Sequence, residues 1–210
     1  MLATADLGRE IVTPQELREL IGEPSEIVRR KQIDHLDEHC RRFIAHAPFL
    51  MLGTADATGR CDVSPRGDAA GFVRVLDDRT LVIPERPGNR LADSLRNIIE
   101  NPRVGLIFLI PNVRETLRVN GRARLVTGGA LLETMAARGN RPLLGIVVEA
   151  EEVTIHCAKA FIRSDLWEAA RHDAPRPVAS LAQIVIDHTK VDLSVDELQQ
   201  RIAIYNTETL

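Results

Sequence analysis

The sequence predicts a mainly β protein of the α+β type, with helices flanking an antiparallel barrel. Three observations predict this fold. About seven short apolar or β-branched segments are separated by turn residues. Helical spacing is confined to the two ends and one middle segment, and the alternating strand-helix units typical of a parallel sheet are missing. The 210 residues, 44% of them hydrophobic, are enough for one such domain with helical extensions.

The first elements are predicted to be helices. Thr13-Pro14-Gln15-Glu16 is a capping box with proline at the first helical position, and Gly22 is a stop signal. A second helix is indicated by apolar residues three or four apart, and Pro48 ends it. Its apolar positions are Ile33, Leu36, Cys40, Ile44 and Ala47. We therefore expect residues 1–32 to form a helical extension that precedes the barrel domain.

Two hairpins and a helix are expected next. The first hairpin turns at Asp56–Gly59, and the second joins Gly71–Leu76 to Arg79–Ile83 around Asp77-Asp78. Pro87-Gly88-Asn89-Arg90 then opens a helix, which Asn101-Pro102 closes. The apolar positions of this helix are Leu91, Leu95, Ile98 and Ile99.

Strands dominate the following part. Val104–Ile110 is apolar throughout, which indicates a central strand covered on both faces. In Leu117–Leu125, Asn120-Gly121 predicts a hairpin with a bulged, three-residue loop. That loop places Leu117, Ala123 and Leu125 on one face and Thr116, Arg118, Arg122 and Arg124 on the other.

The last part completes the barrel and adds helices. Gly145–Ala150 and Val153–Cys157 are predicted as two strands, and Ala158–Arg171 as a helix that carries Phe161 and Trp167. Ser194-Val195-Asp196-Glu197 is a capping box that opens a final helix. We expect the barrel domain to span residues 33–171 and a C-terminal helical extension to span residues 172–210.

Composition excludes several functional classes. The net charge of −3 and only seven aromatic residues argue against nucleic acid as a partner. The longest apolar run, Val104–Ile110, is far shorter than the roughly 20 residues of a membrane-spanning helix. No secretory signal is recognisable, and the three cysteines form no CxxC pair. These features predict a cytoplasmic protein without a membrane partner.

Two arginine-bearing turns are candidate anion sites. In Pro87-Gly88-Asn89-Arg90, glycine permits close approach of a ligand, and a helix start offers free N–H groups. In Asp62–Asp68, a strand runs into a Pro65-Arg66-Gly67 turn that presents a guanidinium group. If the fold brings both turns to one edge of the barrel, they form a phosphate clamp, whereas solvent-exposed turns are the alternative.

Two other patterns are weaker candidates for a functional site. His35-Leu36-Asp37-Glu38-His39 has the order of inverted zinc peptidases and is predicted on a helix, but both histidines lie off its apolar stripe. His156 and Cys157 are neighbours on a predicted strand, so their side chains point to opposite faces and cannot form a catalytic dyad. No metal site is therefore expected.

A family resemblance rests on the middle of the chain. The stretch IPERPGNRLADSLRNIIENPRVGLIFLIPN, followed by RETLRVNGRARLV, resembles the pyridoxamine 5′-phosphate oxidase-like family of FMN-binding split barrels. The similarity runs from about Ile33 to Leu125, and IHCAKAFIRSDLW more loosely resembles a subgroup of flavoproteins without an assigned substrate. The resemblance implies a six-stranded antiparallel Greek-key barrel that forms a homodimer with FMN at the subunit interface.

The resemblance also implies the cofactor-binding residues. Asn89 and Arg90 match the family's Ser-Arg phosphate turn, where Leu91 replaces the usual Lys, and Ile83 with Pro84 matches a Tyr-Thr pair beside the flavin. The remaining expected contacts are Val63, Ser64, Pro65 and Arg66 on a basic strand motif, Thr116 in place of a ring-edge Gln, and Lys159 and Trp167 near the flavin or substrate. No catalytic residue is implied, since the redox chemistry belongs to the flavin.

Several functional hypotheses follow. The first is an FMN-dependent oxidoreductase acting on an unidentified small molecule. The alternative is a non-enzymatic protein that stores or senses flavin, because no substrate-holding motif is recognisable. A deazaflavin-dependent reductase and a zinc hydrolase that uses His35, Glu38 and His39 are further candidates.

Overall fold

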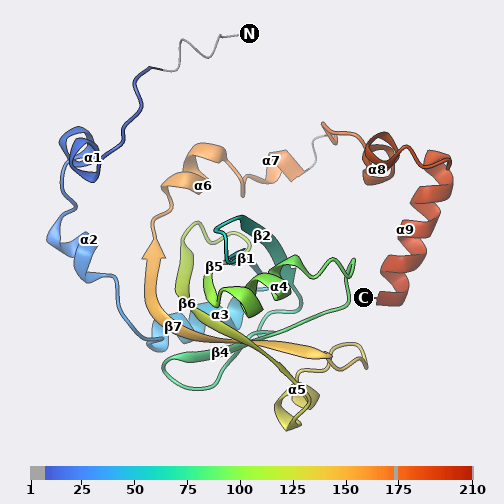
Figure 1. Cartoon of the computed structure of the whole chain (residues 1–210), viewed down its shortest axis with the longest axis horizontal. Coiled ribbons are helices and arrows are strands. Elements are labelled where there is room, and N and C mark those ends of the chain that lie inside the picture. Colours follow the sequence, from blue (N-terminus) through green and yellow to red (C-terminus); the bar gives the residue numbers. More distant parts are fainter. Residues whose placement is uncertain (1–7, 173–174, 210) are drawn as a thin grey trace.

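The computed structural model describes residues 8–172 and 175–209. Its strands are β1 (Phe49–Ala55), β2 (Cys61–Gly67), β3 (Arg74–Val75), β4 (Thr80–Pro84), β5 (Arg103–Leu109), β6 (Thr116–Thr127) and β7 (Leu144–His156). They form one sheet in the order β2-β1-β5-β6-β7-β4-β3, and every neighbouring pair is antiparallel (Figure 1). The predicted antiparallel, mainly β architecture is confirmed.

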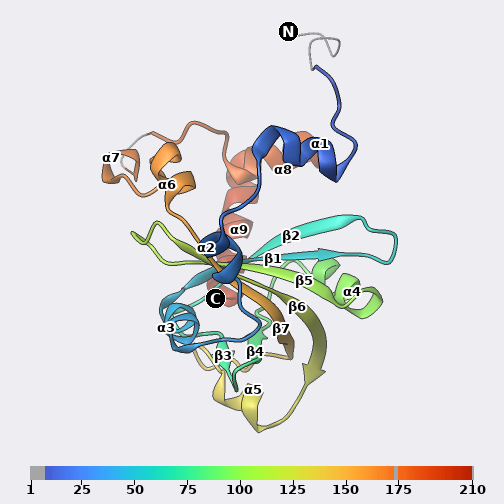
Figure 2. The ribbon, with the colours of Figure 1, turned by 90° about the vertical axis from the view of Figure 1, so that its left-hand side faces the viewer.

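Helices surround this sheet. They are α1 (Pro14–Ile21), α2 (Glu26–Arg30), α3 (Glu38–His46), α4 (Asp93–Glu100), α5 (Ala130–Thr134), α6 (Lys159–Ser164), α7 (Ala169–His172), α8 (Leu181–Thr189) and α9 (Val195–Thr209). Figure 2 shows α1 well away from the sheet, Figure 1 shows α2 to the side of it, and neither helix has a buried residue. Both predicted capping boxes form, at Thr13 with Glu16 and at Ser194 with Glu197. In the described parts of the chain, every helix is too short or too polar to cross a membrane.

The sheet curls around an apolar core. Leu52, Leu106 and Phe108 are fully buried and meet Ile44 of α3 and Ile98 of α4 in one cluster. Arg66 at the end of β2 pairs with Glu85 directly after β4, although four strands separate β2 from β4 in the sheet. The family resemblance implies six strands, whereas the described residues form seven, because the two-residue β3 adds an edge strand beside β4.

The predicted hairpin at Asn120-Gly121 is wrong. Residues 116–127 form the single strand β6, which pairs with β5 on one side and β7 on the other. The irregularity at Asn120-Gly121 is a β-bulge, at which Glu151 of β7 is left without an opposite residue. Buried positions alternate through the bulge, so Leu117 and Ala123 still share one face and Arg122 and Arg124 the other. The face assignment holds although the turn does not exist.

Other boundaries also differ from the prediction. The two strands expected at 145–150 and 153–157 are one strand, β7, whose interruption is the same bulge. The helix expected over 158–171 is split into α6 and α7, because Asp165 adopts a left-handed conformation with φ of 50°. Strand β5 is internal, but its burial alternates, so only one of its two faces is fully covered. The two predicted hairpins, β1 with β2 and β3 with β4, are confirmed.

Candidate functional site

A row of polar side chains lies along the edge strand β2. Asp62, Ser64 and Arg66 are partly buried, whereas the residues between them are exposed. Successive side chains of a strand point to opposite faces, so these three share the face that is turned toward the core. Polar groups on an inward face need hydrogen-bond partners, and the structure supplies them from outside the sheet.

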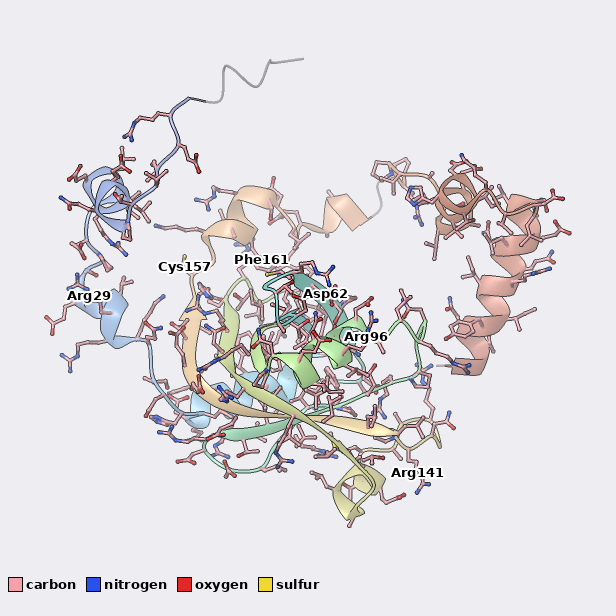
Figure 3. All side chains as sticks on the ribbon, in the orientation of Figure 1. Arg29, Asp62, Arg96, Arg141, Cys157 and Phe161 are labelled. Carbon is pink, nitrogen blue, oxygen red and sulfur yellow. The ribbon has the colours of Figure 1, made fainter. Side chains whose placement is uncertain are left out.

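The start of α4 provides the first partner. The hydroxyl oxygens of Ser64 and Ser94 are 2.9 Å apart, and the Ser94 hydroxyl donates to Asp62 Oδ2 at 2.9 Å. Ser94 itself is buried. Figure 3 shows Asp62 beside α4, on which Arg96 is labelled. The segment around Arg66 therefore lies against α4, the helix that follows the Pro87-Gly88-Asn89-Arg90 turn in the sequence.

Arg66 is the cation at the centre of this site. Its side chain is 17% exposed and forms an ion pair with Glu85. Next to this pair, Arg86 Nε donates to Asp68 Oδ2 at 2.6 Å. Within the described residues, the Nε of Arg66 is buried and has no hydrogen-bond partner. A buried donor without an acceptor costs about 1–3 kcal/mol, and an oxygen atom of a ligand would satisfy it.

The loop at residues 87–92 precedes α4 and differs from the prediction. The helix begins at Asp93 and not at Pro87, because Arg90 and Ala92 have positive φ values of 63° and 58°. Arg90 is therefore outside the first helical turn, where its positive charge would have opposed the positive end of the helix dipole. Leu91 and Ile99, expected on the apolar face of the helix, are mostly exposed.

Two side-chain features of this loop bear on ligand binding. Asn89 Oδ1 accepts a hydrogen bond from the backbone N–H of Leu91 at 3.0 Å. Arg90 is exposed and forms no side-chain hydrogen bond or ion pair with the residues described by the structure. Arg90 precedes Ser94, the residue of α4 that contacts β2, by four positions in the sequence.

Ile83 and Pro84 lie at the end of β4, directly before Glu85. Both are buried, and Ile83 belongs to the main apolar core. Their side chains are occupied by packing, so only their backbone is available to a ligand. Val63 and Pro65 alternate with the polar row of β2 and are exposed on the outer face of the sheet.

The remaining candidates form a second group at the ends of β6 and β7. Thr116 is 8% exposed and lies opposite His156. Trp167 Nε1 donates to the carbonyl oxygen of Val113 at 2.9 Å, and its ring stacks on Phe161 with ring centres 5.4 Å apart. Lys159 is exposed at the start of α6. Burial lowers the pKa of His156, and the nearby charge of Arg118 adds to this effect.

The zinc pattern is not assembled. Helix α3 begins at Glu38 with Asp37 as its N-cap, so His35 precedes the helix and cannot lie one turn before His39 on the same face. His35 Nδ1 instead contacts Asp34 Oδ1 at 3.0 Å. Over residues 8–172 and 175–209, no three His, Cys, Asp or Glu side chains are grouped closely enough to hold a metal ion.

Sequence reasoning missed Ser94, Glu85 and Tyr205. Ser94 precedes Ile98 by four positions, so it lies on the buried stripe of α4, and a polar residue on such a stripe was the available signal. Glu85 was hidden because its partner Arg66 is contributed by a distant strand. Tyr205 donates a hydrogen bond to the carbonyl oxygen of Gly88, a contact that no local pattern indicates.

The sequence matches a known protein family. The family model described as pyridoxamine 5′-phosphate oxidase matches residues 36–157. No curated protein matches the chain significantly.

Several solved structures are similar to this chain, and three of them are as follows. An FMN-binding protein from Syntrophomonas wolfei is 17% identical, with 68% of this chain and 96% of that chain covered and a TM-score of 0.47. A putative pyridoxamine 5′-phosphate oxidase from Lactobacillus delbrueckii is 22% identical, with 58% and 98% covered and a TM-score of 0.43. The heme storage protein HutZ from Vibrio cholerae is 18% identical, with 58% and 93% covered and a TM-score of 0.42.

The matched region contains all seven strands, α3, α4 and the polar row of β2. It covers more than half of the chain. The protein therefore belongs to the pyridoxamine 5′-phosphate oxidase family.

Proposed function

We propose that the protein binds FMN and uses it for oxidation or reduction of a small molecule. The contact between Ser64 and Ser94 carries this proposal, because it joins the Arg66-bearing strand to the start of α4. The FMN phosphate is placed between Arg66 and residues Asn89, Arg90 and Leu91. Membership of the pyridoxamine 5′-phosphate oxidase family supports a flavin as the ligand.

The residues present fit a phosphate group. The Nε of Arg66, which has no acceptor among the residues that the structure describes, offers a buried donor, and the exposed Arg90 offers a second charge. Charge-assisted hydrogen bonds of this type contribute about 1.5–3 kcal/mol each. Glu85 holds the opposite side of the Arg66 guanidinium and so fixes the direction in which the Nε–H points. Ser64 and Ser94 hold β2 against the start of α4 beside these two arginines' segments, with the hydroxyl proton of Ser94 already donated to Asp62.

The flavin, when bound, supplies the electron-transfer chemistry. The chain binds and orients it and excludes water. Thr116 and Trp167 are proposed to contact the ring or the substrate, Lys159 to lie at its outer edge, and the backbone of Ile83 and Pro84 to border it. Val63 and Pro65 are proposed to contribute through the outer face of β2, which faces a second subunit.

A homodimer with FMN at its interface is part of the proposal. The outer face of the sheet exposes Phe49, Met51, Val63 and Ile107, between 38% and 58% of each residue. Met51 lies between Pro65 on β2 and Ile107 on β5, so these side chains form one apolar patch. Patches of this kind are typical of protein interfaces, and a second copy would supply the other wall for the flavin.

The proposal is tested by identifying the bound molecule. We expect the purified protein to be yellow, mass spectrometry after denaturation to release FMN, and added FMN to raise the melting temperature. A protein that neither binds saturating FMN nor is stabilised by it would disprove the proposal. Release of a deazaflavin would keep the site and change the cofactor.

A second measurement separates an enzyme from a flavin store. Anaerobic reduction by NAD(P)H, followed by turnover with an electron acceptor, is expected for an oxidoreductase. A flavin that is bound tightly but reduced no faster than free FMN would favour storage or sensing.

A further inference from the structure

The C-terminal helices form a hairpin that reaches the candidate phosphate loop. Helices α8 and α9 pack on each other, and α9 ends beside the loop that leads into α4 (Figure 1). The hydroxyl of Tyr205, on α9, donates to the carbonyl oxygen of Gly88 at 2.5 Å. The two residues are 117 positions apart in the sequence.

This contact is the main anchor of the loop. For the described residues, the hydrogen bonds of positions 87–91 are the one from Tyr205 and the local one between Asn89 Oδ1 and the Leu91 N–H. Arg90 and Ala92 have positive φ values, which non-glycine residues rarely adopt without external support. The loop conformation therefore depends on a contact with the C-terminal hairpin.

The contact also sets the direction of a backbone donor. In a trans peptide, the carbonyl and the N–H of the same unit point in opposite directions. Tyr205 holds the Gly88 carbonyl toward α9, so the N–H of Asn89 in the same peptide unit points away from α9. The Asn89 side chain is occupied with Leu91, which leaves its backbone N–H as the group available to an anion.

We infer that Tyr205 is a positioning residue for the phosphate of the cofactor. By fixing the Gly88-Asn89 peptide, it presents the Asn89 N–H and the Arg90 side chain to one phosphate group. This inference rests on the proposed function and extends it, because it couples the C-terminal hairpin to recognition of the phosphate rather than of the flavin ring.

The test compares FMN with riboflavin, which has the same ring and no phosphate. Tyr205→Phe keeps the aromatic ring and removes the hydroxyl. We expect the variant to bind FMN about fivefold more weakly, the ratio that one lost hydrogen bond gives, and to bind riboflavin as the wild type does. In the flavin-free protein, the amide hydrogens of residues 88–91 should exchange faster in the variant.

Thr207→Val is the matched control. It removes a hydroxyl from the same helix, one that donates to Ala203 at 3.0 Å within α9, and it should change neither flavin affinity nor loop exchange. Equal weakening of FMN and riboflavin by Tyr205→Phe, or unchanged loop exchange, would overturn the inference while leaving the proposed function intact. A wild-type protein that binds no FMN would overturn both.

Discussion

Arg90 combines an unusual backbone conformation with an exposed charge that pairs with no other residue in the described part of the chain. An exposed guanidinium group of this kind is accessible to an anionic ligand that comes from solvent. We predict that Arg90→Ala weakens FMN binding about 10- to 150-fold, the effect of losing one charge-assisted hydrogen bond. Flavin titration measures this, and the melting temperature of the flavin-free protein should not change.

The control for Arg90→Ala is Arg124→Ala. Arg124 is also exposed, but it lies on β6, opposite Val147. Its removal lowers the positive charge of the protein equally without touching the loop. Equal loss of affinity in the two variants would show that only net charge matters, and unchanged affinity in Arg90→Ala would place the phosphate elsewhere.

The three cysteines are predicted to react differently with thiol reagents. Burial raises the pKa of Cys40 to about 12, with the neighbouring Asp37 adding to the effect. The backbone N–H of Lys159 lowers the pKa of Cys157, and the positive charge of Lys159 acts in the same direction. Cys61 and Cys157 are exposed. Because the thiolate is the reactive form, we expect Cys157 to be alkylated first at pH 7 and Cys40 only after unfolding.

Alkylation followed by peptide mass spectrometry measures these rates. Raising the pH should accelerate modification of Cys157 until its thiol is fully ionised, because the thiolate is the reactive form. Since the pKa of Cys157 is lowered, its rate should level off at a lower pH than that of an ordinary cysteine. Modification of Cys40 in the folded protein at the rate of Cys61 would contradict the burial of its side chain in the core.

At the level of elements, the bulge between β6 and β7 depends on Gly121. A Cβ atom at this position would lie 1.9 Å from the carbonyl oxygen of Glu149. Because the nearest atom is a backbone oxygen of a paired strand and not the end of a flexible side chain, the backbone must move to admit the Cβ. We predict that Gly121→Ala destabilises the protein by about 3 kcal/mol, the upper range for overpacking, as measured by denaturant unfolding.

Gly53→Ala is the matched control for the bulge. Gly53 also lies within a strand, and its added Cβ would meet the Gly105 carbonyl at an ordinary 3.5 Å. It should cost far less than Gly121→Ala. Equal effects of the two substitutions would mean that any strand glycine is sensitive, and that the close approach at the bulge has no special role.

The sequence predicts elements well where the signal is local. Both capping boxes form because each needs only residues three positions apart. Asn120-Gly121 misled because the same dipeptide suits a hairpin turn and a bulge, and only pairing with both β5 and β7 decides between them. The late start of α4 was equally hidden, since its cause is positive φ at two non-glycine residues.

The candidate site was predictable only in part for the same reason. The sequence singled out the segments around Arg66 and Arg90, because arginine beside glycine and proline is a local pattern. The contacts of the Arg66 segment with α4 and with the end of β4 depend on the hydrogen bond between Ser64 and Ser94 and on the pairing of Arg66 with Glu85, and both require the curled sheet. The contacts of the candidate residues with a cofactor, and the domain boundaries at residues 33 and 171, stay predictions.

At the scale of the whole molecule, the outer face of the sheet is apolar and exposed, which bears on how the protein assembles. Phe49 and Met51 alternate with the buried Leu50 and Leu52, so one face of β1 forms the core and the other is apolar yet exposed. A strand whose outer face contacts only solvent usually carries polar or charged residues on that face. Apolar residues on both faces of β1 and β5 are typical of strands that a second subunit covers.

We therefore predict that Met51→Glu prevents dimer formation. A carboxylate at the centre of the patch, between Pro65 and Ile107, would lose its water in the dimer without gaining a partner. This should raise the dimer dissociation constant by about 100-fold or more, as measured by sedimentation velocity. The monomer should remain folded, because the Met51 side chain is already partly exposed. It should bind FMN more weakly, because the flavin loses one wall of its site.

The control is Leu143→Glu, at an exposed position in the loop before β7, which should change neither dimer formation nor FMN affinity. A wild-type protein that sediments as a monomer, or a Met51→Glu variant that stays dimeric with full FMN affinity, would show that the apolar face has another role.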